Sequence, residues 1–207
     1  MRSDQECEAA VVARNVEALR QMPARELLAA MQVGPRTVDC LLQCTYLGIM
    51  TDEPARLAAG GELRDLVMAR VWQPKSAEEV GVVREPLLVQ VELFGSKTGA
   101  PALHILPGPY PAVCHPHVEP LLPGFVCLTD DWQPETMTAA TLCRSLAAML
   151  RFEAGTWSLD PGRPVAPGIA EWLGGAGAEA FEFPLKTPPG RHRGIRILDA
   201  ADEEAAE

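Results

Sequence analysis

Apolar residues near the N-terminus recur three or four positions apart, which is the spacing of one helical face. They are Ala9, Val12, Val16 and Leu19. Ser3 followed by Glu6 has the form of a capping box, and Pro23 ends the pattern. The sequence therefore predicts an N-terminal helix whose apolar face packs on the rest of the protein.

The middle of the chain alternates apolar and polar positions, as strands do. The segments with this pattern are 38–46, 66–72, 87–94 and 102–106. Stretches rich in glycine and proline separate them as expected turns or loops, at 34–35, 52–61, 74–86 and 95–101. Together the segments predict an antiparallel meander. Cys40 and Cys44 share one face of the first segment and are predicted to be core thiols.

The second half of the chain returns to helical spacing. Thr138 is placed to cap a helix whose apolar positions, Leu142, Leu146, Met149 and Leu150, fall on one side. A shorter helix is expected over 165–173, because Pro164 precedes it and two glycines follow it. A possible strand over 195–198 leads to an acidic end, 199–207, which we expect to be disordered. These elements predict an α+β fold.

Composition limits the class of protein. With 207 residues and 47% hydrophobic content, the chain can bury one substantial core. Its formal net charge of −10 argues against a nucleic-acid surface and favours basic partner surfaces. No apolar run is long enough to cross a bilayer and the N-terminus lacks the order of a signal peptide, so we expect a cytoplasmic protein with no membrane partner. Six cysteines are too sparse for a disulfide framework, and free thiols are expected.

Four short motifs follow one another in the second half of the chain. They are His115-Pro116-His117, Gly124-Phe125-Val126-Cys127-Leu128, Trp132-Gln133-Pro134 and Asp160-Pro161. Each motif is weak alone, but their order and spacing around one cysteine are more specific. In this order they resemble the catalytic core of the ubiquitin-conjugating enzyme family. The resemblance covers about 110–173 and, more loosely, the N-terminal helix.

The resemblance implies a ubiquitin-conjugating-enzyme-like α+β fold, with an N-terminal helix, an antiparallel meander, an active-cysteine loop, a long packing helix and a shorter C-terminal helix. The catalytic domain would span 1–173, and 174–207 would be a C-terminal extension with the acidic end. Cys127 stands where the family carries a ubiquitin-like protein as a thioester. A thiolate is a good nucleophile and a good leaving group, which suits such an acyl relay.

Three further residues receive roles from the resemblance. His117 stands in place of the family's asparagine, and its imidazole N–H can serve the oxyanion or hold the catalytic loop. His115 is expected to order that loop. Asp160 matches the acidic residue that positions the incoming amine. Asp130 and Asp131 compete for this role because they follow the cysteine closely, and an Asp-Pro pair is also a common turn.

The resemblance also implies partners: an activating enzyme, a ubiquitin-like protein and a protein target, with no cofactor and no metal. Arg14 and Arg20, on the outer face of the N-terminal helix, are candidate contacts for the activating enzyme. The missing asparagine, a Tyr110-Pro111 pair close to the His-Pro-His motif and a longer region before Tyr110 indicate a divergent member. Its Ala, Gly, Arg and Pro usage is consistent with a GC-rich bacterial genome, and some bacterial operons of this kind act in antiphage defence.

Three alternatives stay open. A domain of the same fold that has lost catalysis would be a binding or scaffold module, which the replaced asparagine allows. Cys114, His115, His117, Cys127 and Cys143 are candidate zinc ligands, although no Cys-x-x-Cys pair is present. A cysteine hydrolase would need an orienting third group and an oxyanion hole, which no motif in the sequence indicates.

Overall fold

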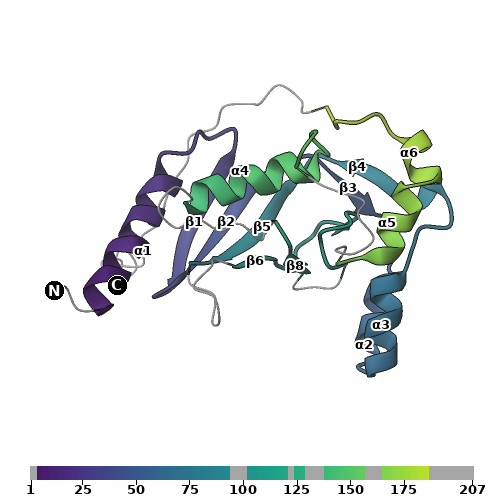
Figure 1. The fold of residues 1–207 in the computed structure, drawn as a ribbon, viewed down its shortest axis with the longest axis horizontal. Coiled ribbons are helices and arrows are strands. Elements are labelled where there is room, and N and C mark those ends of the chain that lie inside the picture. The colour runs from purple at the N-terminus through teal and green to yellow at the C-terminus, as the bar shows by residue number, and fades with distance from the viewer. Residues whose placement is uncertain (1–3, 94–101, 121–123, 129–137, 157–164, 187–207) are drawn as a thin grey trace.

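A five-stranded antiparallel sheet with helices on one side forms the larger part of the structure, a computed structural model that describes residues 4–93, 102–120, 124–128, 138–156 and 165–186. The strands are β1 (Leu27–Gly34), β2 (Thr37–Gln43), β5 (Pro86–Glu92), β6 (Ala102–Ile105) and β8 (Gly124–Val126), in the order β1-β2-β5-β6-β8. Helix α4 (Ala139–Leu150) crosses one face of this sheet, and α1 (Asp4–Arg20) lies beside it (Figure 1). The α+β class and the antiparallel sheet are confirmed.

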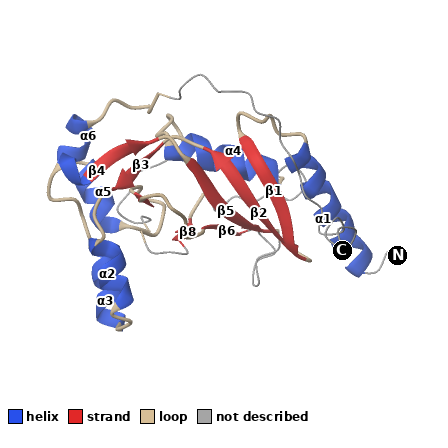
Figure 2. Ribbon diagram, turned by 180° about the vertical axis from the view of Figure 1, so that it is seen from behind, coloured by secondary structure: helices blue, strands red, loops and turns tan. Residues whose placement is uncertain are grey.

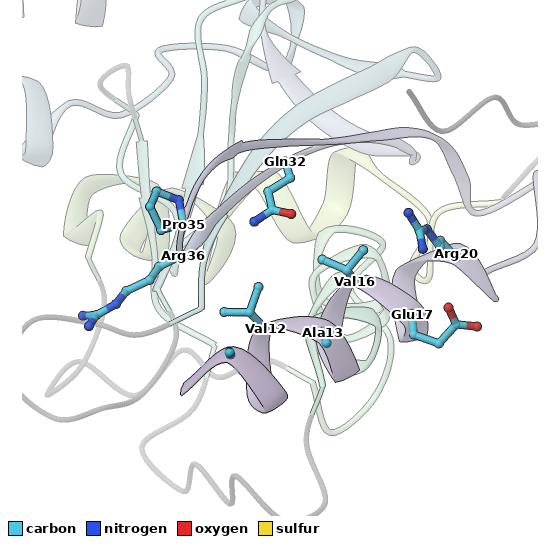
Figure 3. Close-up of a pocket in the computed structure, with 9 residues that line it drawn as sticks. Val12, Ala13, Val16, Glu17, Arg20, Gln32, Pro35 and Arg36 are labelled. Carbon is cyan, nitrogen blue, oxygen red and sulfur yellow. The ribbon is translucent and has the colours of Figure 1, made fainter. Parts of the chain in front are cut away.

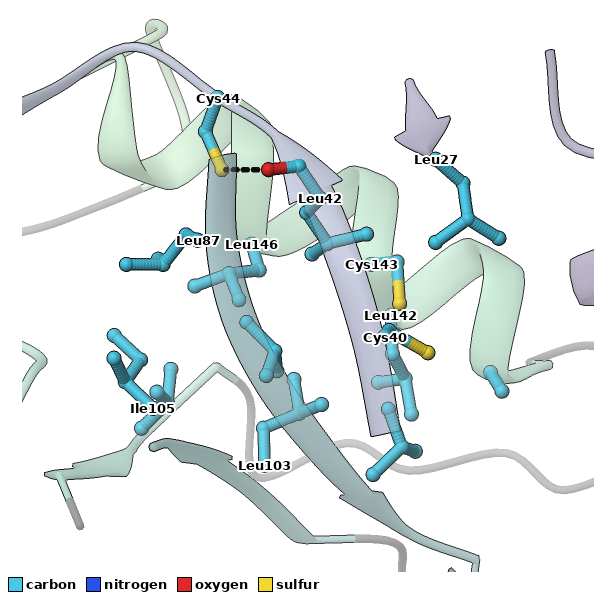
Figure 4. Close-up of a cluster of buried hydrophobic side chains, with 14 of the residues drawn as sticks. Leu27, Cys40, Leu42, Cys44, Leu87, Leu103, Ile105, Leu142, Cys143 and Leu146 are labelled. Carbon is cyan, nitrogen blue, oxygen red and sulfur yellow. Dashed lines mark hydrogen bonds between the residues drawn. The ribbon is translucent and has the colours of Figure 1, made fainter. Parts of the chain in front are cut away.

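Alternating burial along two central strands forms the main core. Val38, Cys40 and Leu42 of β2 point inward opposite Val91, Val89 and Leu87 of β5 in an antiparallel register. This follows from the two-residue period of a strand, which sends every second side chain to the same face. Leu142, Cys143 and Leu146 of α4 pack against these inward-pointing side chains and complete the core (Figure 4). Cys40, Cys44 and Cys143 are buried there, as the sequence predicts.

Helix α4 begins at the cap that its sequence indicates and is joined to α1. The hydroxyl of Thr138 accepts a hydrogen bond from the backbone N–H of Thr141 and so caps α4. The buried side chain of Asn15 in α1 accepts a hydrogen bond from the backbone N–H of Ala139, at 2.6 Å, and donates one to the carbonyl of Val11. One amide therefore joins the N-terminal helix to the first turn of α4.

The segment 66–72 is helical, so the strand predicted there is wrong. Helix α3 (Leu63–Val71) packs against α2 (Glu53–Ala59), which lies in a stretch expected to be a loop. Leu, Arg, Met and Ala are strong helix formers, and they outweigh the short apolar alternation of this segment. Pro54 sits in the first turn of α2, and Gly61 adopts φ +71° in the turn between the helices. The proline and the glycine that suggested a loop therefore belong to a helical hairpin.

A second, smaller layer adjoins the hairpin (Figure 2). Its three-stranded sheet has the order β4-β3-β7, formed by β3 (Tyr46–Ile49), β4 (Val80–Val83) and β7 (Ala112–Val113). The segment predicted as one strand over 38–46 is thus divided between β2 and β3. A 3-10 turn (Ala77–Glu79) and β4 replace most of the loop expected over 74–86.

The C-terminal part of the described chain packs on this second layer. The helix expected over 165–173 is confirmed as α5 (Pro167–Leu173), and α6 (Ala176–Ala180) follows. Leu185 is buried in a cluster with Leu47, Ile49 and Trp72, and its N–H donates to the carbonyl of Arg151. Residues 174–186 of the expected extension therefore contribute to a core. The Ser3 cap, the expected strand 195–198 and the acidic end lie outside the described residues.

Membrane-spanning segments were also expected to be absent. Across the part of the chain that the structure describes, no helix has both the length and the apolar character needed to cross a bilayer.

Candidate active site

Cys127 lies directly after β8, opposite the His-Pro-His motif. Its backbone N–H donates to the carbonyl of His117 at 2.9 Å, and the N–H of Glu119 donates to the carbonyl of Phe125 at 2.9 Å. An antiparallel bridge joins Val118 to Val126 between these two bonds. The two short segments therefore form a ladder in which His117 stands across from Cys127.

The side chains of this ladder divide between two faces. Val118 and Val126 are buried in the main core, whereas His117 and Cys127 are both half-buried. Because neighbouring residues of a strand point to opposite faces, His117 and Cys127 share the outward face. Directly opposed residues have Cβ atoms about 4.5–5.5 Å apart. Two of the predicted site residues are thus brought together on the surface side of a sheet edge.

Cys127 is half-buried, whereas Cys40, Cys44, Cys114 and Cys143 are buried. Burial raises the pKa of Cys44 and of Cys114 to about 12. A thiol hydrogen bond with Cys40, together with burial, raises the pKa of Cys143 well above its ordinary value. Since the thiolate is the reactive form, Cys44, Cys114 and Cys143 are poor nucleophiles, and Cys127 is the one of these five thiols that is not buried.

His115 holds the His-Pro-His loop from its buried side. Its imidazole is fully buried, and its Nδ1 accepts a hydrogen bond from the backbone N–H of His117 at 3.1 Å. Burial, with a smaller effect of His117, lowers the pKa of His115 to about 3, while a hydrogen bond with the backbone of Met149 acts in the opposite direction. The ring is therefore neutral, with its proton on Nε2. This arrangement fits the expected loop-ordering role and makes His115 a positioning residue.

Backbone contacts fix the same loop to the second layer. The carbonyl of Pro116 accepts from the N–H of Ala166, just before α5, at 3.0 Å, and the N–H of Cys114 donates to the carbonyl of Leu47 at 2.7 Å. The His115 ring also packs against Phe152, with centroids 4.7 Å apart. The loop is therefore held by elements from both layers, which limits how far His117 can move relative to Cys127.

Three predicted features of the site lie outside the described residues. These are Asp160, the competing pair Asp130 and Asp131, and the Trp132-Gln133-Pro134 motif. Their roles stay predictions.

Other residues on the cysteine face were missed by sequence reasoning. Phe125 is 42% exposed and stands opposite His104 in the register of β8 and β6, with ring centroids 5.9 Å apart. Glu119 accepts two close contacts from the guanidinium of Arg70, at 2.6 and 2.7 Å. A large aromatic at an outward strand position is a signal that could have identified Phe125. Arg70 could not be found, because its segment was assigned to a strand.

The zinc alternative is not supported by the geometry. Within the described ranges, no three or more His, Cys, Asp or Glu residues are grouped so as to hold a metal ion. Of the five candidate ligands, Cys143 belongs to the main core and Cys114 to the second cluster, so the two thiols point into different interiors.

A groove lies at the other end of the five-stranded sheet, between α1 and the β1–β2 hairpin (Figure 3). It has a volume of about 830 Å³ and an apolar floor from Val12, Ala13 and Val16. Arg20 and Arg36 lie at its rim. Arg20, a candidate contact for an activating enzyme, thus borders a concave surface beside β1, at the edge of the sheet opposite β8.

Comparisons of the chain with protein-family models, with curated proteins and with solved structures find no match. The geometry itself still limits the chemistry. An accessible thiol opposite an imidazole, on the rigid edge of a sheet, can accept an acyl group and pass it to an amine. On the same face, two residues before Cys127, Phe125 is 42% exposed.

Proposed function

We propose that the protein is a conjugating enzyme for a ubiquitin-like protein, with a ubiquitin-conjugating-enzyme-like fold. In the first step the Cys127 thiolate attacks the thioester carbonyl held by an activating enzyme, a new thioester forms, and the activating enzyme's thiolate leaves. In the second step a target amine attacks the same carbonyl and loses a proton, an amide bond forms, and the Cys127 thiolate leaves.

The observation that carries this proposal is the position of Cys127. It is half-buried, whereas Cys40, Cys44, Cys114 and Cys143 are buried, and it stands across from His117 on the outward face of a sheet edge. The order of the four motifs supports the same conclusion. The antiparallel sheet β1-β2-β5-β6-β8, with α1 beside it and α4 packed on it, is consistent with the fold that the resemblance implies, although β3, α2, α3 and β4 intervene between β2 and β5.

Two residues receive roles in the second step. The imidazole of His117 would donate a hydrogen bond to the oxyanion formed when the amine attacks. Asp160 would position the amine and accept its proton. His115 supports His117 by accepting its backbone N–H and takes no part in proton transfer. The groove beside α1, with Arg20 at its rim, is the proposed docking place of the activating enzyme.

A thioester assay tests the function directly. The chain is incubated with ATP, a cognate activating enzyme and its ubiquitin-like protein, and a reductant-sensitive adduct is expected on gels. Cys127→Ala should abolish this adduct, and Cys127→Lys should give a stable isopeptide-linked product. The control is Cys114→Ala, with folding checked by circular dichroism. An adduct that survives Cys127→Ala but disappears in Cys114→Ala would refute the assignment.

The roles of His117 and Asp160 are separated by single-turnover discharge to an amine. His117→Ala and Asp160→Ala should slow discharge by on the order of 10²-fold while charging is nearly unchanged, because orientation and proton removal matter only in the second step. His117→Asn, which keeps a side-chain N–H donor, should slow discharge less than His117→Ala does. Equal impairment of both steps would make these residues structural.

A binding or scaffold module is the second candidate, and the histidine in place of the family's asparagine favours it. Such a module would bind the ubiquitin-like protein without forming an adduct. Normal binding in calorimetry combined with no adduct from the unmodified chain would establish this alternative.

A further inference from the structure

The groove between α1 and the β1–β2 hairpin has an apolar floor and a basic residue at each end. The side chains of Val12 and Val16 point into it, and Arg36 and Arg20 lie at its opposite ends (Figure 3). Its volume of about 830 Å³ falls within the roughly 300–1,000 Å³ of ordinary ligand sites. A groove of this size accepts the side chains of a short segment of chain.

Strand β1 borders this groove at the edge of the five-stranded sheet. β2 pairs with one side of β1, and within the described residues no strand pairs with its other side. Met31 and Val33 of β1 are 49% and 45% exposed. A strand edge with exposed apolar side chains can bind an added extended segment. The groove therefore favours an extended and partly apolar occupant.

The lining of the groove is basic, although the protein is acidic. Its charged residues are Arg20, Arg36 and Glu17, whereas the whole chain has a formal net charge of −10. The Glu17 carboxylate accepts a hydrogen bond from the side-chain amide of Gln21 at 3.0 Å. Two guanidinium groups and one carboxylate leave a local excess of positive charge, so the groove attracts carboxylates.

The C-terminal extension of this chain contains a segment with matching chemistry. The sequence predicts a strand over 195–198, in which Ile195 and Ile197 would share one face. The next nine residues, 199–207, contain five carboxylate side chains and no basic residue. The two isoleucines match the apolar floor of the groove, and the carboxylates match the arginines at its ends.

The extension is long enough to reach the groove. The N–H of Leu185 donates to the carbonyl of Arg151, just after the C-terminal end of α4. At the other end of α4, the backbone of Ala139 is bonded to Asn15 of α1, within one turn of the groove floor. Helix α4 has twelve residues and is about 18 Å long (Figure 1). Residues 187–194 can span about 26 Å when extended, so the predicted strand comes within reach of α1.

Attachment to the same chain makes a weak contact sufficient. A short linker gives an effective concentration in the mM range. A segment with a dissociation constant of about 1 mM for the groove would then occupy it much of the time. A separate peptide of the same affinity would need a concentration of about 1 mM to compete, so the chain's own extension is the occupant that is favoured.

We propose that residues 195–207 bind in the groove of their own molecule, with Ile195 and Ile197 on its apolar floor and the acidic end beside Arg20 and Arg36. Binding here covers the surface that we assign to the activating enzyme, so the two would compete. This competition, unlike the binding itself, rests on the proposed function. The extension would limit charging of the catalytic cysteine without contacting it.

Hydrogen exchange of the full chain, followed by mass spectrometry, tests the binding without an activating enzyme. Amides of 195–198 should exchange about two- to tenfold more slowly than unstructured ones, because protection follows the ratio of effective concentration to dissociation constant. Ala13→Glu should remove this protection by placing a charge on the groove floor. The matched control is Ala10→Glu, at an exposed position of α1 that does not line the groove.

Two outcomes of this measurement would overturn the proposal. One is protection of 195–198 that is absent from the unmodified chain or that survives Ala13→Glu. The other is protection that grows with protein concentration, which would identify a second copy as the source of the bound segment.

The reciprocal variant changes the extension and leaves the groove intact. In Ile195→Ser/Ile197→Ser the amides of α1 should exchange faster, and a synthetic peptide of residues 191–207 at about 1 mM should restore their slower exchange. A peptide with the same composition in scrambled order is the control. Glu203→Lys/Glu204→Lys should also weaken the protection, most clearly at low salt. Exchange of α1 that responds to none of these changes, or equally to both peptides, would overturn the proposal.

Charging kinetics test the competition. Initial rates of charging are measured over a series of activating-enzyme concentrations. Ile195→Ser/Ile197→Ser should lower the KM for the activating enzyme by about two- to tenfold and leave kcat unchanged, because the bound extension blocks docking but not the transfer step. The matched control is Val82→Ser, at a 40% exposed apolar position on β4. An unchanged KM would overturn the competition.

Failure of the two hypotheses can be distinguished. If the unmodified chain forms no thioester, the proposed function fails, while exchange of 195–198 and α1 still decides whether the extension binds in the groove. If thioester forms normally but neither segment is protected, the inference is refuted and the proposed function stands.

Discussion

Acid should destabilise this protein through a single buried imidazole. His115 is fully buried, and its pKa falls from an ordinary value of 6.5 to about 3 in the folded state. Between these two values the unfolded chain binds a proton that the folded protein excludes. The free energy of unfolding therefore decreases as the pH falls through 6.5, and the loss is complete only below the folded-state pKa.

The size of this loss in the free energy of unfolding follows from the shift in the pKa of His115. Each pH unit below 6.5 costs about 1.4 kcal/mol, so His115 alone should remove about 1.4 kcal/mol at pH 5.5 and about 2.7 kcal/mol at pH 4.5. A domain with a total stability of about 5–15 kcal/mol would show this clearly. The relevant variant is His115→Asn, since the amide oxygen can still accept the backbone N–H of His117 and the side chain does not titrate in this range.

Urea unfolding at a series of pH values between 4.5 and 7.5 measures the effect. Carboxylates contribute nearly equally to both proteins, so the informative quantity is the difference between the two pH profiles. His115→Asn should lower stability at pH 7.5 but should lack the additional loss on acidification. Parallel profiles over this range would show that His115 is protonated in the folded protein, and the assigned tautomer and burial would then be wrong.

Further expectations concern other parts of the molecule. Iodoacetamide should label Cys127 in the native protein much faster than Cys114, as read by peptide mass spectrometry, and equal rates would contradict the burial difference. Thr138→Ala should lower the free energy of unfolding by about 1 kcal/mol through loss of the α4 cap, with Thr138→Ser as the control. Gly168→Ala should lower the melting temperature, because its Cβ would collide with the Val71 carbonyl, and an unchanged melting temperature would refute this close packing.

Elements with a strong local signal were predictable from the sequence. The core faces of β2 and β5 and the capped helix α4 each combine a clear period with a cap or a boundary residue. Helix α3 was missed because Leu66 to Trp72 is a short apolar run, and such runs fit a strand or a helix equally well. Packing against α2 favours the helix over the strand. That contact could not be read from the sequence, because Gly60 and Gly61 between the two helices look like part of a longer loop.

Candidate site residues could be proposed from the sequence, but their geometry could not. The motif order singled out Cys127, His115 and His117 as candidates. The sequence could not show that Val118 pairs with Val126, which sets His117 across from Cys127 and turns both outward. The link between Arg70 and Glu119 was equally hidden, because it joins residues 49 positions apart on elements whose relative placement depends on the tertiary fold.

Neighbouring residues just before the His-Pro-His motif point into two different hydrophobic cores. Val113 belongs to the main core and its neighbour Cys114 to the second cluster. Inserting or deleting one residue here would exchange these two side chains between interiors of different shape and would shift the histidines that follow. We therefore expect natural variation in length to be confined to other parts of the chain. The spacing from β7 to the histidines would then be a more dependable guide for recognising distant relatives than the identity of any single residue in it.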